Sequence, residues 1–521
     1  MKLNAKIFAL FLGMFSLVHA VDTLDVFVLR VQFKEESPNN SLTTGTGAFD
    51  SDTATYNLDP SGSRGSNHYW RKHLEFANAY YQAASGGELF IKVNVFPENG
   101  KTAYKLDKPM IDYNRTQKMK GEKTAEFDEA RSRDYLQFVY DAVMAAHKSD
   151  ASPFKIPLSK NPNTKRVYMI AHAGASRLLD GGSMGTKGAD TPGDFLDIYI
   201  SKADWIYLPD SLPGVVIAED SLNNGIVLKD SAIDTLRSVM VVSETASQDK
   251  LNWGINGIVV NQIGRELGMP NTYDDVKGIS RLGYFDMMDF AGYNAGNGFF
   301  PVLPAAWERA YMGWSKVKEV RPTAGHPVTV DIAAAGSGLG TEIVKVPLSA
   351  SEYILIENRQ RSWKKDGTVD VYLGEAKDNN DTTDTRSIIV DSLYTVFEDS
   401  ICIKGKCNYN KKKAKGLVLG TSSFDAGLPA SGIAVWKVND WYLRETAEYG
   451  VANRWGGEQY RDHQYGLSLV ESDGVLSIGK AFKNALGEDT YDFGRQTGQC
   501  QCDILLHALG QLEATSPIQC R

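Results

Sequence analysis

Apolar side chains recur with two different periods along the first 315 residues. Three segments have the pattern of strands, either alternating or short and apolar: residues 24–33 (LDVFVLRVQF), 89–96 and 166–172 (RVYMIAH). Three others carry apolar residues at helical spacing: from residue 68 to the Gly86–Gly87 pair, residues 131–147 and residues 254–268. This alternation of strands and helices predicts an α+β or α/β domain over residues 21–315.

The pattern changes after residue 315. Short β-type runs, separated by Gly, Asp and Asn turns, occupy residues 326–335, 342–348, 352–358, 368–374, 386–397, 416–422, 432–438 and 465–471. Such runs predict a β-sandwich domain over residues 316–477. The tail, residues 478–521, is less regular and contains one helix-like run, residues 502–512.

The chain begins with MKLNAKIFALFLGMFSLVHA, in which two lysines precede an apolar run over residues 7–18 and Ala20 is a small residue. This pattern predicts a signal peptide over residues 1–20, cleaved after Ala20. A membrane anchor is the alternative, but the run is shorter than the roughly 20 residues that a spanning helix needs. No later segment approaches that length, so we expect a secreted, periplasmic or cell-surface protein without a transmembrane segment after cleavage.

Composition narrows the function only slightly. The formal net charge is −8 over 521 residues, and acidic and basic residues are interspersed, so nothing favours a nucleic-acid partner. A chain of this length favours two or three domains, because single cores stop growing at roughly 250–300 residues.

The five cysteines lie in the last quarter of the chain: Cys402, Cys407, Cys500, Cys502 and Cys520. The first two could link the strands of a short hairpin, and the remaining pairing is open. In an exported protein we expect two disulfides and one free or intermolecular thiol. A zinc site built from the last three cysteines is the alternative, although their spacing fits no common structural zinc site.

The most informative stretch is residues 255–289, INGIVVNQIGRELGMPNTYDDVKGISRLGYFDMMD. A metzincin-like helix requires H-E-x-x-H-x-x-G-x-x-(H or D), and the corresponding slots of this chain are Asn261, Gln262, Arg265, Gly268 and Asn271. Only the glycine is kept, and the Met287–Met288 pair follows downstream. The alternative is that this stretch is an ordinary amphipathic helix, wrongly aligned with the peptidase motif. The flanking residues that match the motif argue against this alternative.

Seven segments, in order, resemble the immune inhibitor A family of secreted zinc metallopeptidases. They are residues 77–97, 167–175, 261–274, 282–289, 301–314, 352–361 and 424–439. In that family the segment similar to residues 261–274 reads HExGHxLGLPDxYD, and Met288 falls at the Met-turn. The resemblance implies a zincin-like domain over residues 21–315, a β-sandwich domain after it, a substrate cleft above the helix, and zinc-dependent proteolysis.

The residues at the slots do not support that activity. Asn261 and Asn271 offer amide oxygens, which bind zinc weakly, and Gln262 has no titrating group to serve as a general base. Arg265 places a permanent positive charge one helical turn from Asn261, where the metal would lie. We therefore expect no catalytic residue, no metal and no other cofactor. A ligand set assembled from distant histidines stays open; His172 is better explained as a satisfied histidine at a strand end.

Arg265 suggests a structural hypothesis. Its guanidinium could take the place of the metal by binding the amide oxygens of Asn261 or Asn271, with a carboxylate of Asp274, Asp286 or Glu266 as counter-charge. The alternative is a side chain directed into solvent. The family resemblance also raises a calcium site, but Asp274, Asp275 and Asp286 are too few to define one.

Three functions follow from these observations. The first is a catalytically inactive, exported pseudopeptidase that binds a polypeptide or a surface partner through the old cleft. The second is a surface or carbohydrate-binding protein that uses the β domain. The third is an active zinc peptidase with an unrecognised ligand set. The aromatic residues that motivate the second are Trp363, Tyr372, Tyr394, Tyr409, Trp436, Trp441, Tyr442, Tyr449 and Trp455.

Overall fold

The structure is a computed structural model of the whole chain. It describes residues 21–50, 58–59, 63–99, 102–177, 191–209, 211–218, 224–248, 252–273, 280, 282–289, 296–374, 383–389, 401–403, 406–408, 416–447, 465–470, 481–483 and 489–491. The expected signal peptide, the helix-like run at residues 502–512 and the last three cysteines lie outside these ranges. None of the described helices combines the length and the hydropathy needed to cross a membrane.

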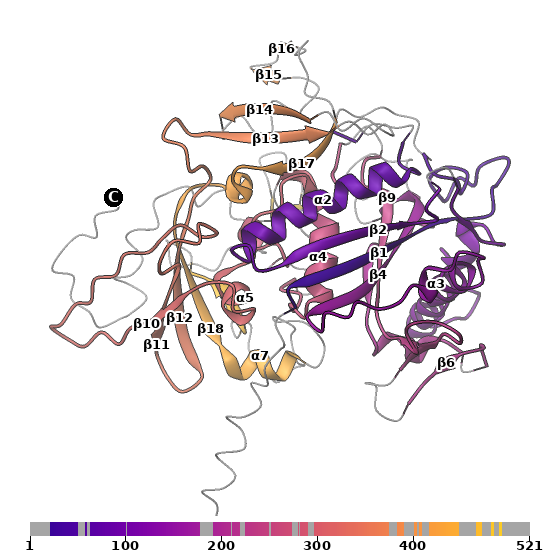
Figure 1. Cartoon of the computed structure of the whole chain (residues 1–521), viewed down its shortest axis with the longest axis horizontal. Helices are drawn as coiled ribbons and strands as arrows, with labels where there is room; N and C mark the ends of the chain where they lie inside the picture. Colours follow the sequence, from indigo (N-terminus) through magenta and orange to yellow (C-terminus); the bar gives the residue numbers. More distant parts are fainter. Residues whose placement is uncertain are drawn as a thin grey trace, which may run out of the picture.

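A mostly parallel sheet forms the centre of the first half (Figure 1). Its strands, in spatial order, are β2 (Phe90–Phe96), β1 (Thr23–Gln32), β4 (Thr164–Ala175), β9 (Val239–Thr245) and β5 (Ile198–Ile200), and β3 (Tyr104–Lys105) also pairs with β1. Strands β1, β2, β4 and β9 are parallel, whereas β5 is antiparallel to β9. The three predicted strands are confirmed as β1, β2 and β4.

Both faces of this sheet are covered, and β1 contributes apolar side chains to each. Val26 and Val28 point into the core that contains α2 (Asn67–Ala84) and α4 (Asn256–Glu266). Phe27 and Leu29 point into a second core, which contains α3 (Thr124–His147). Successive side chains of a strand face opposite sides, so one segment builds both cores. The three predicted helices are confirmed, with α3 beginning seven residues earlier than expected.

Helix α2 has sequence signals at both ends. The Ser66 hydroxyl accepts a hydrogen bond from the Tyr69 backbone N–H at 3.1 Å, the usual contact of an N-cap serine. After the helix, Gly86 and Gly87 have φ values of 66° and 88°, a left-handed conformation that glycine adopts without steric cost. The glycine pair therefore ends the helix where the sequence predicts.

The second half contains two larger sheets and two short hairpins. A five-stranded sheet has the order β10 (Val317–Glu319), β11 (Ile343–Pro347), β12 (Glu352–Arg359), β18 (Gly432–Asn439) and β19 (Leu467–Leu469). A three-stranded sheet has the order β14 (Thr383–Ile389), β13 (Thr368–Gly374) and β17 (Leu417–Thr421). The hairpins are β15 (Ile401–Ile403) with β16 (Lys406–Asn408) and β20 (Ala481–Lys483) with β21 (Asp489–Tyr491).

Smaller elements complete the described chain. A further three-stranded sheet has the order β6 (Val215–Val216), β7 (Gly225–Val227) and β8 (Thr235–Leu236), and two short helices are α5 (Ala306–Tyr311) and α7 (Asp440–Ala447). Single 3-10 turns are η1 (Met110–Tyr113), η2 (Pro153–Lys155), η4 (Asp204–Tyr207), η6 (Gly283–Phe285), η8 (Gly296–Gly298) and η10 (Phe424–Gly427).

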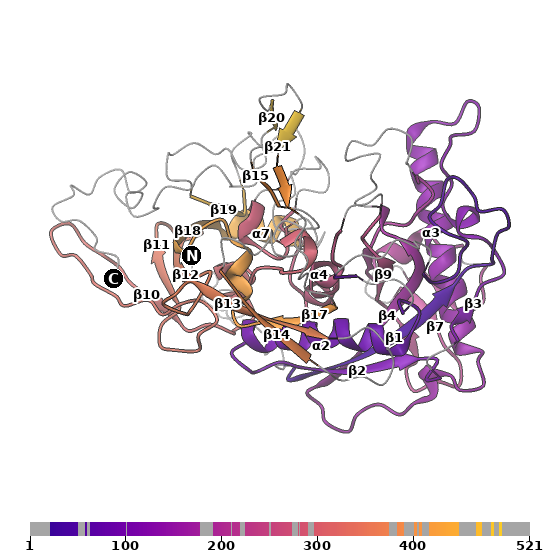
Figure 2. The ribbon, with the colours of Figure 1, turned by 90° about the horizontal axis from the view of Figure 1, so that it is seen from above.

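The two larger β sheets pack on different partners. Val369 and Val371 of β13 belong to the same core as α2, and in Figure 1 the three-stranded sheet lies over that helix. Leu355 and Trp436 of the five-stranded sheet pack instead with Ala306 of α5. Figure 2 shows α4 between the five-stranded sheet and the central sheet. The core therefore crosses the expected boundary at residue 315, and a β-sandwich stays a prediction.

Two differences from the predicted elements stand out. Residues 326–335, expected as a strand, are described without a β ladder; half of them are exposed, and Ala334 makes an isolated bridge to Asn358 of β12. Val330 and Ile332 touch the outer face of the five-stranded sheet. Strand β9 is buried on both faces but was not predicted, because its apolar run covers only residues 239–242 and three polar residues follow it. The other predicted β runs correspond to strands where they are described, and β14 covers only the start of residues 386–397.

Candidate functional site

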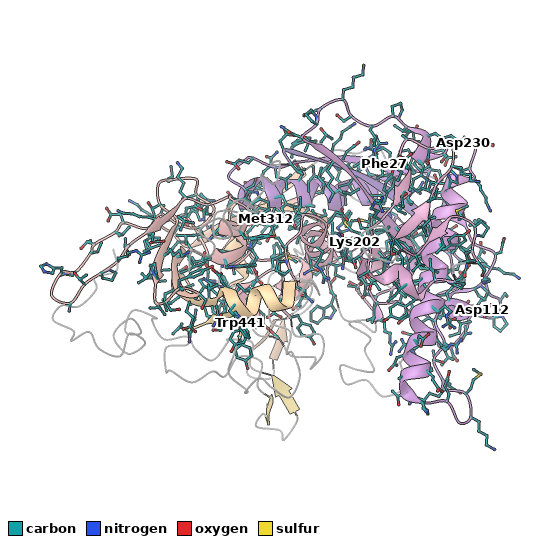
Figure 3. All side chains as sticks on the ribbon, turned by 90° about the horizontal axis from the view of Figure 1, so that it is seen from below. Phe27, Asp112, Lys202, Asp230, Met312 and Trp441 are labelled. Atoms are coloured by element: carbon teal, nitrogen blue, oxygen red, sulfur yellow. The ribbon has the colours of Figure 1, made fainter. Side chains whose placement is uncertain are left out.

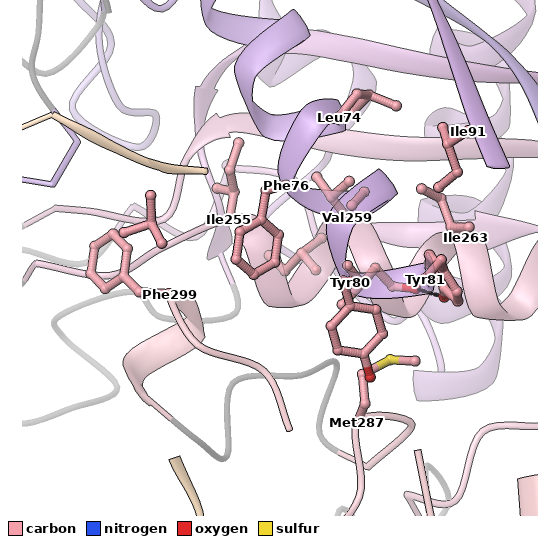
Figure 4. Close-up of a cluster of buried hydrophobic side chains, with 14 of the residues drawn as sticks. Leu74, Phe76, Tyr80, Tyr81, Ile91, Ile255, Val259, Ile263, Met287 and Phe299 are labelled. Atoms are coloured by element: carbon pink, nitrogen blue, oxygen red, sulfur yellow. Dashed lines mark hydrogen bonds between the residues drawn. The ribbon is translucent and has the colours of Figure 1, made fainter. Parts of the chain in front are cut away.

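Helix α4 carries three of the degenerate slots and is buried on almost every side. Ile258, Val259 and Ile263 pack against α2 and the central sheet (Figure 4). Asn261 and Gln262 are also buried, with exposed fractions of 4% and 3%. The two side chains that replace a zinc-binding histidine and a catalytic glutamate therefore lie inside the packed protein.

The helix rests directly on the Met287–Met288 pair. A Cβ built on Gly264 would lie 2.7 Å from the Met288 sulfur and 3.4 Å from the Met287 terminal methyl group. Both methionines are buried. The structure thus brings the predicted Met-turn residue and the predicted helix into contact, and the contact requires a glycine at residue 264.

The amide groups at the slots make contacts within the protein. The Asn261 side-chain N–H donates to the Met287 carbonyl at 3.4 Å, and the Asn271 side-chain oxygen accepts from the Tyr273 backbone N–H at 3.3 Å. The Gln262 amide oxygen is buried without a hydrogen-bond partner. Amide groups and an arginine do not form a donor set that fits Zn²⁺.

Arg265 lies against the edge of the central sheet. Its guanidinium carbon is 5.6 Å from the centre of the Tyr199 ring on β5, and its side chain is half-buried. Of the counter-charges expected for it, Glu266 binds Lys165 at 2.7 Å. Asp286 accepts hydrogen bonds from elsewhere in the chain, and Asp274 lies outside the described residues. The role of Arg265 as a replacement for the metal stays a prediction.

A polar group surrounds Tyr199 at this edge. Glu266 accepts a hydrogen bond from the Ser238 hydroxyl at 2.9 Å in addition to the Lys165 contact. Burial raises the pKa of Tyr199 well above its ordinary value, and the nearby Glu266 carboxylate raises this pKa further. Tyr199 is therefore a neutral hydrogen-bonding group beside Arg265 at neutral pH.

His172 is a satisfied histidine at the end of β4, as the sequence predicts. Its Nδ1 lies 2.8 Å from the Ala173 carbonyl oxygen, so Nδ1 donates, and Nε2 lies 3.2 Å from the Ser243 hydroxyl. The side chain is fully buried. Burial lowers the pKa of His172 to about 4, so the ring is neutral and accepts the Ser243 proton.

A buried charge network at the carboxyl end of β9 has no signal in the sequence. Asp59 accepts hydrogen bonds from Arg64 at 3.1 Å and Tyr69 at 3.2 Å, and it also binds the Thr245 hydroxyl. Tyr69 donates to the Glu244 backbone carbonyl at 2.7 Å. An acidic residue in a long polar loop gives no sequence signal for its strand partner. The network fixes that loop on the sheet and offers no open ligand position.

The described residues contain no group of three or more His, Cys, Asp or Glu side chains arranged to hold a metal ion. Both oxygens of Asp286 accept hydrogen bonds, from the Thr272 hydroxyl at 2.5 Å and the Ala305 backbone N–H at 3.0 Å. Asp274 and Asp275, the other carboxylates weighed for calcium, lie outside the described ranges.

The aromatic candidates from residues 316–477 divide into three groups. Trp436 is fully buried and belongs to the core. Trp363, Tyr372 and Trp441 are exposed, and Tyr442 is half-buried. The remaining candidates, Tyr394, Tyr409, Tyr449 and Trp455, lie outside the described residues.

Comparisons with known proteins add little. No protein-family model matches the chain, and no curated protein matches it significantly. Among solved structures, the crystal structure of wild type OgpA from Akkermansia muciniphila is similar at 10% sequence identity, covering 81% of this chain and 89% of that chain, with a TM-score of 0.22. A TM-score this low does not establish a shared fold, so we draw no argument from it.

Proposed function

We propose that the chain is an exported metallopeptidase-like protein that binds polypeptide without hydrolysing it. One observation on α4 carries this proposal. The helix packs on Met288 through Gly264, but the positions that hold a zinc-binding histidine and a catalytic glutamate in the resembled family hold the buried amides of Asn261 and Gln262 here. The resemblance to the immune inhibitor A family supplies the expectation of a peptide-binding frame.

The edge strand β5 is the proposed binding position. In the described residues β5 ends the central sheet, so an extended peptide can pair with its outer edge. Tyr199 on this strand and Arg265 on α4 lie in contact there. A cation beside the edge favours a segment that carries carboxylates. The proposed ligand is therefore an extended, acidic polypeptide or an exposed segment of a surface protein.

Binding of unfolded casein tests the proposal. Fluorescently labelled, reduced and carboxymethylated casein is titrated with the full chain, and the casein is then recovered and analysed by mass spectrometry. We expect binding with intact casein, and weaker binding by Arg265→Glu. Arg133→Glu is the matched control, because Arg133 lies exposed on α3 and pairs only locally with Glu129. Cleaved casein would favour an active peptidase, and equal binding by both variants would contradict the proposed position.

A surface or carbohydrate-binding role is the second candidate, and an aromatic cluster on the β side favours it. Tyr311 is 56% exposed and stacks on Trp307, with ring centres 5.2 Å apart and an interplanar angle of 15°. Tyr353 donates to the Asp440 carboxylate at 3.0 Å, and Figure 3 shows Trp441 on the outer side of α7. Aromatic faces next to polar groups suit pyranose rings, whose C–H groups meet the negative ring face.

The second candidate predicts retention on insoluble polysaccharide. The full chain would be retained, and the double variant Tyr311→Ala/Trp441→Ala would be released. Retention that survives this double substitution, or no retention of the wild type, would remove this candidate.

Because export is part of the proposal, amino-terminal sequencing of the mature protein should begin at Val21.

A further inference from the structure

A buried charge cluster joins α5 to the five-stranded sheet. Arg309 on α5 contacts Glu342 at 3.1 Å and also binds Glu357. Arg359 contacts Glu357 at 3.1 Å and Asp425 at 2.6 Å. All five side chains are 7% exposed or less. Three carboxylates therefore already share two guanidinium groups.

Two more carboxyl groups lie next to this cluster without a cation of their own. Asp286 is held by hydrogen bonds from Thr272 and Ala305. Glu308, on α5, is fully buried, and neither of its carboxyl oxygens has a hydrogen-bond partner. An ionised carboxylate in such a position loses its hydration without a side-chain hydrogen-bond partner to replace it.

We propose that Glu308 keeps its proton at neutral pH, and that Glu308 and Asp286 together form a pH-sensitive latch between α5 and the segment that carries Met287 and Met288. The electrostatic surroundings of Glu308 favour this protonated state. Burial is the main cause that raises the pKa of Glu308 well above its ordinary value; the neighbouring Asp286 and Glu357 raise this pKa further, and Arg309 opposes them. Burial also raises the pKa of Asp286.

The hydrogen bonds of Asp286 place the latch between α4, the methionine pair and α5. Asp286 directly precedes the methionine pair, and its two oxygens hold Thr272, which follows α4, and Ala305, which precedes α5. Ionisation of Glu308 places a second negative charge beside Asp286 inside the core. We expect α5 and residues 282–289 to separate first as the pH rises, and to pack more firmly in acidic surroundings.

The sign of the pH dependence follows from the proton count. The folded chain keeps the Glu308 proton, whereas the unfolded chain releases it above the ordinary glutamate pKa of about 4.3. Folding therefore takes up a proton above that pH, and stability decreases as the pH rises until Glu308 ionises in the folded state as well. One proton changes the unfolding equilibrium constant about tenfold per pH unit.

Urea unfolding of the full chain between pH 5 and pH 8 tests the latch, with Glu308→Gln as the neutral, isosteric variant. We expect the pH slope of the variant to differ from that of the wild type by one proton. Glu319→Gln is the control, because the Glu319 side chain is 44% exposed and should leave the slope unchanged. Equal slopes for the wild type and Glu308→Gln would overturn the proposal.

A measurement on the wild type keeps the test decisive if Glu308→Gln folds poorly. Infrared spectra at pH 7 should show the C=O stretch of a buried, protonated carboxylic acid, and hydrogen exchange in residues 282–289 and α5 should accelerate with pH beyond the intrinsic increase. Absence of the protonated-acid band, or exchange in these segments that follows only the intrinsic rate, would contradict the latch.

Discussion

Replacing Gly264 with alanine tests the packing of α4 on the methionine pair. A Cβ at residue 264 would lie 2.7 Å from the Met288 sulfur and 3.1 Å from the Tyr81 hydroxyl oxygen. Met288 is fully buried, so its sulfur has to move within a closely packed core. Overpacking of this kind costs about 1–3 kcal/mol, whereas alanine gains about 1 kcal/mol over glycine in a helix. We expect a net loss of up to about 2 kcal/mol in the free energy of unfolding.

Urea unfolding followed by circular dichroism measures this loss. Gly432→Ala is the control, because a Cβ there meets no atom within 4 Å and should change stability by less than about 0.5 kcal/mol. Met288→Ala leaves a cavity that can receive the new methyl group, so the Gly264→Ala penalty should shrink in that background. A Gly264→Ala protein that is more stable than the wild type by about 1 kcal/mol, the full gain of alanine in a helix, or the same change in both backgrounds, would refute the contact.

The remaining predictions concern a buried pair, a buried histidine and a hairpin. Arg359→Met should cost about 3–5 kcal/mol in thermal or urea unfolding, because it leaves buried carboxylates unpaired. The exposed control Arg321→Met should cost about 1 kcal/mol or less. Because burial lowers the pKa of His172 to about 4, the unfolded chain binds a proton at this residue below about pH 6.5 that the folded chain excludes. Stability should therefore decrease by about 3 kcal/mol as the pH falls from 6.5 to 4, and His172→Gln should weaken this dependence. The Cα atoms of Cys402 and Cys407 are direct partners in the β15–β16 ladder, so non-reducing peptide mapping should recover them linked; alkylation of both without reductant would contradict the pairing.

Local signals were sufficient to predict the elements that the first core needs. The serine cap and the glycine pair fix both ends of α2, and the apolar pattern of residues 24–33 predicts the strand β1. Strand β9 escaped prediction because its apolar run covers only residues 239–242 and is followed by three polar residues. Residues 326–335 do not form the predicted strand, because β propensity measures the fit to a pleated, half-buried surface and only Ala334 of this segment pairs with a strand, by a single bridge to Asn358 of β12.

In the candidate site, too, some contacts follow from the sequence and others do not. The family resemblance predicts a Met-turn at Met288, and the structure places Met288 against Gly264 of α4. Spacing says nothing about the burial of Gln262 or about the Tyr199 ring beside Arg265, because both depend on segments distant in the chain. The unpartnered carboxyl of Glu308 is likewise invisible in the sequence, where Glu308 is one acidic residue among many.

Metal analysis combined with a proteolysis assay tests the central claim most directly. The purified full chain is incubated with zinc, dialysed, analysed for bound metal by mass spectrometry, and then assayed on casein with and without chelator. We predict no stoichiometric zinc and no chelator-sensitive cleavage, because Asn261, Gln262, Arg265 and Asn271 supply neither ligands nor a general base. One zinc ion per chain together with casein cleavage that a chelator abolishes would contradict this account.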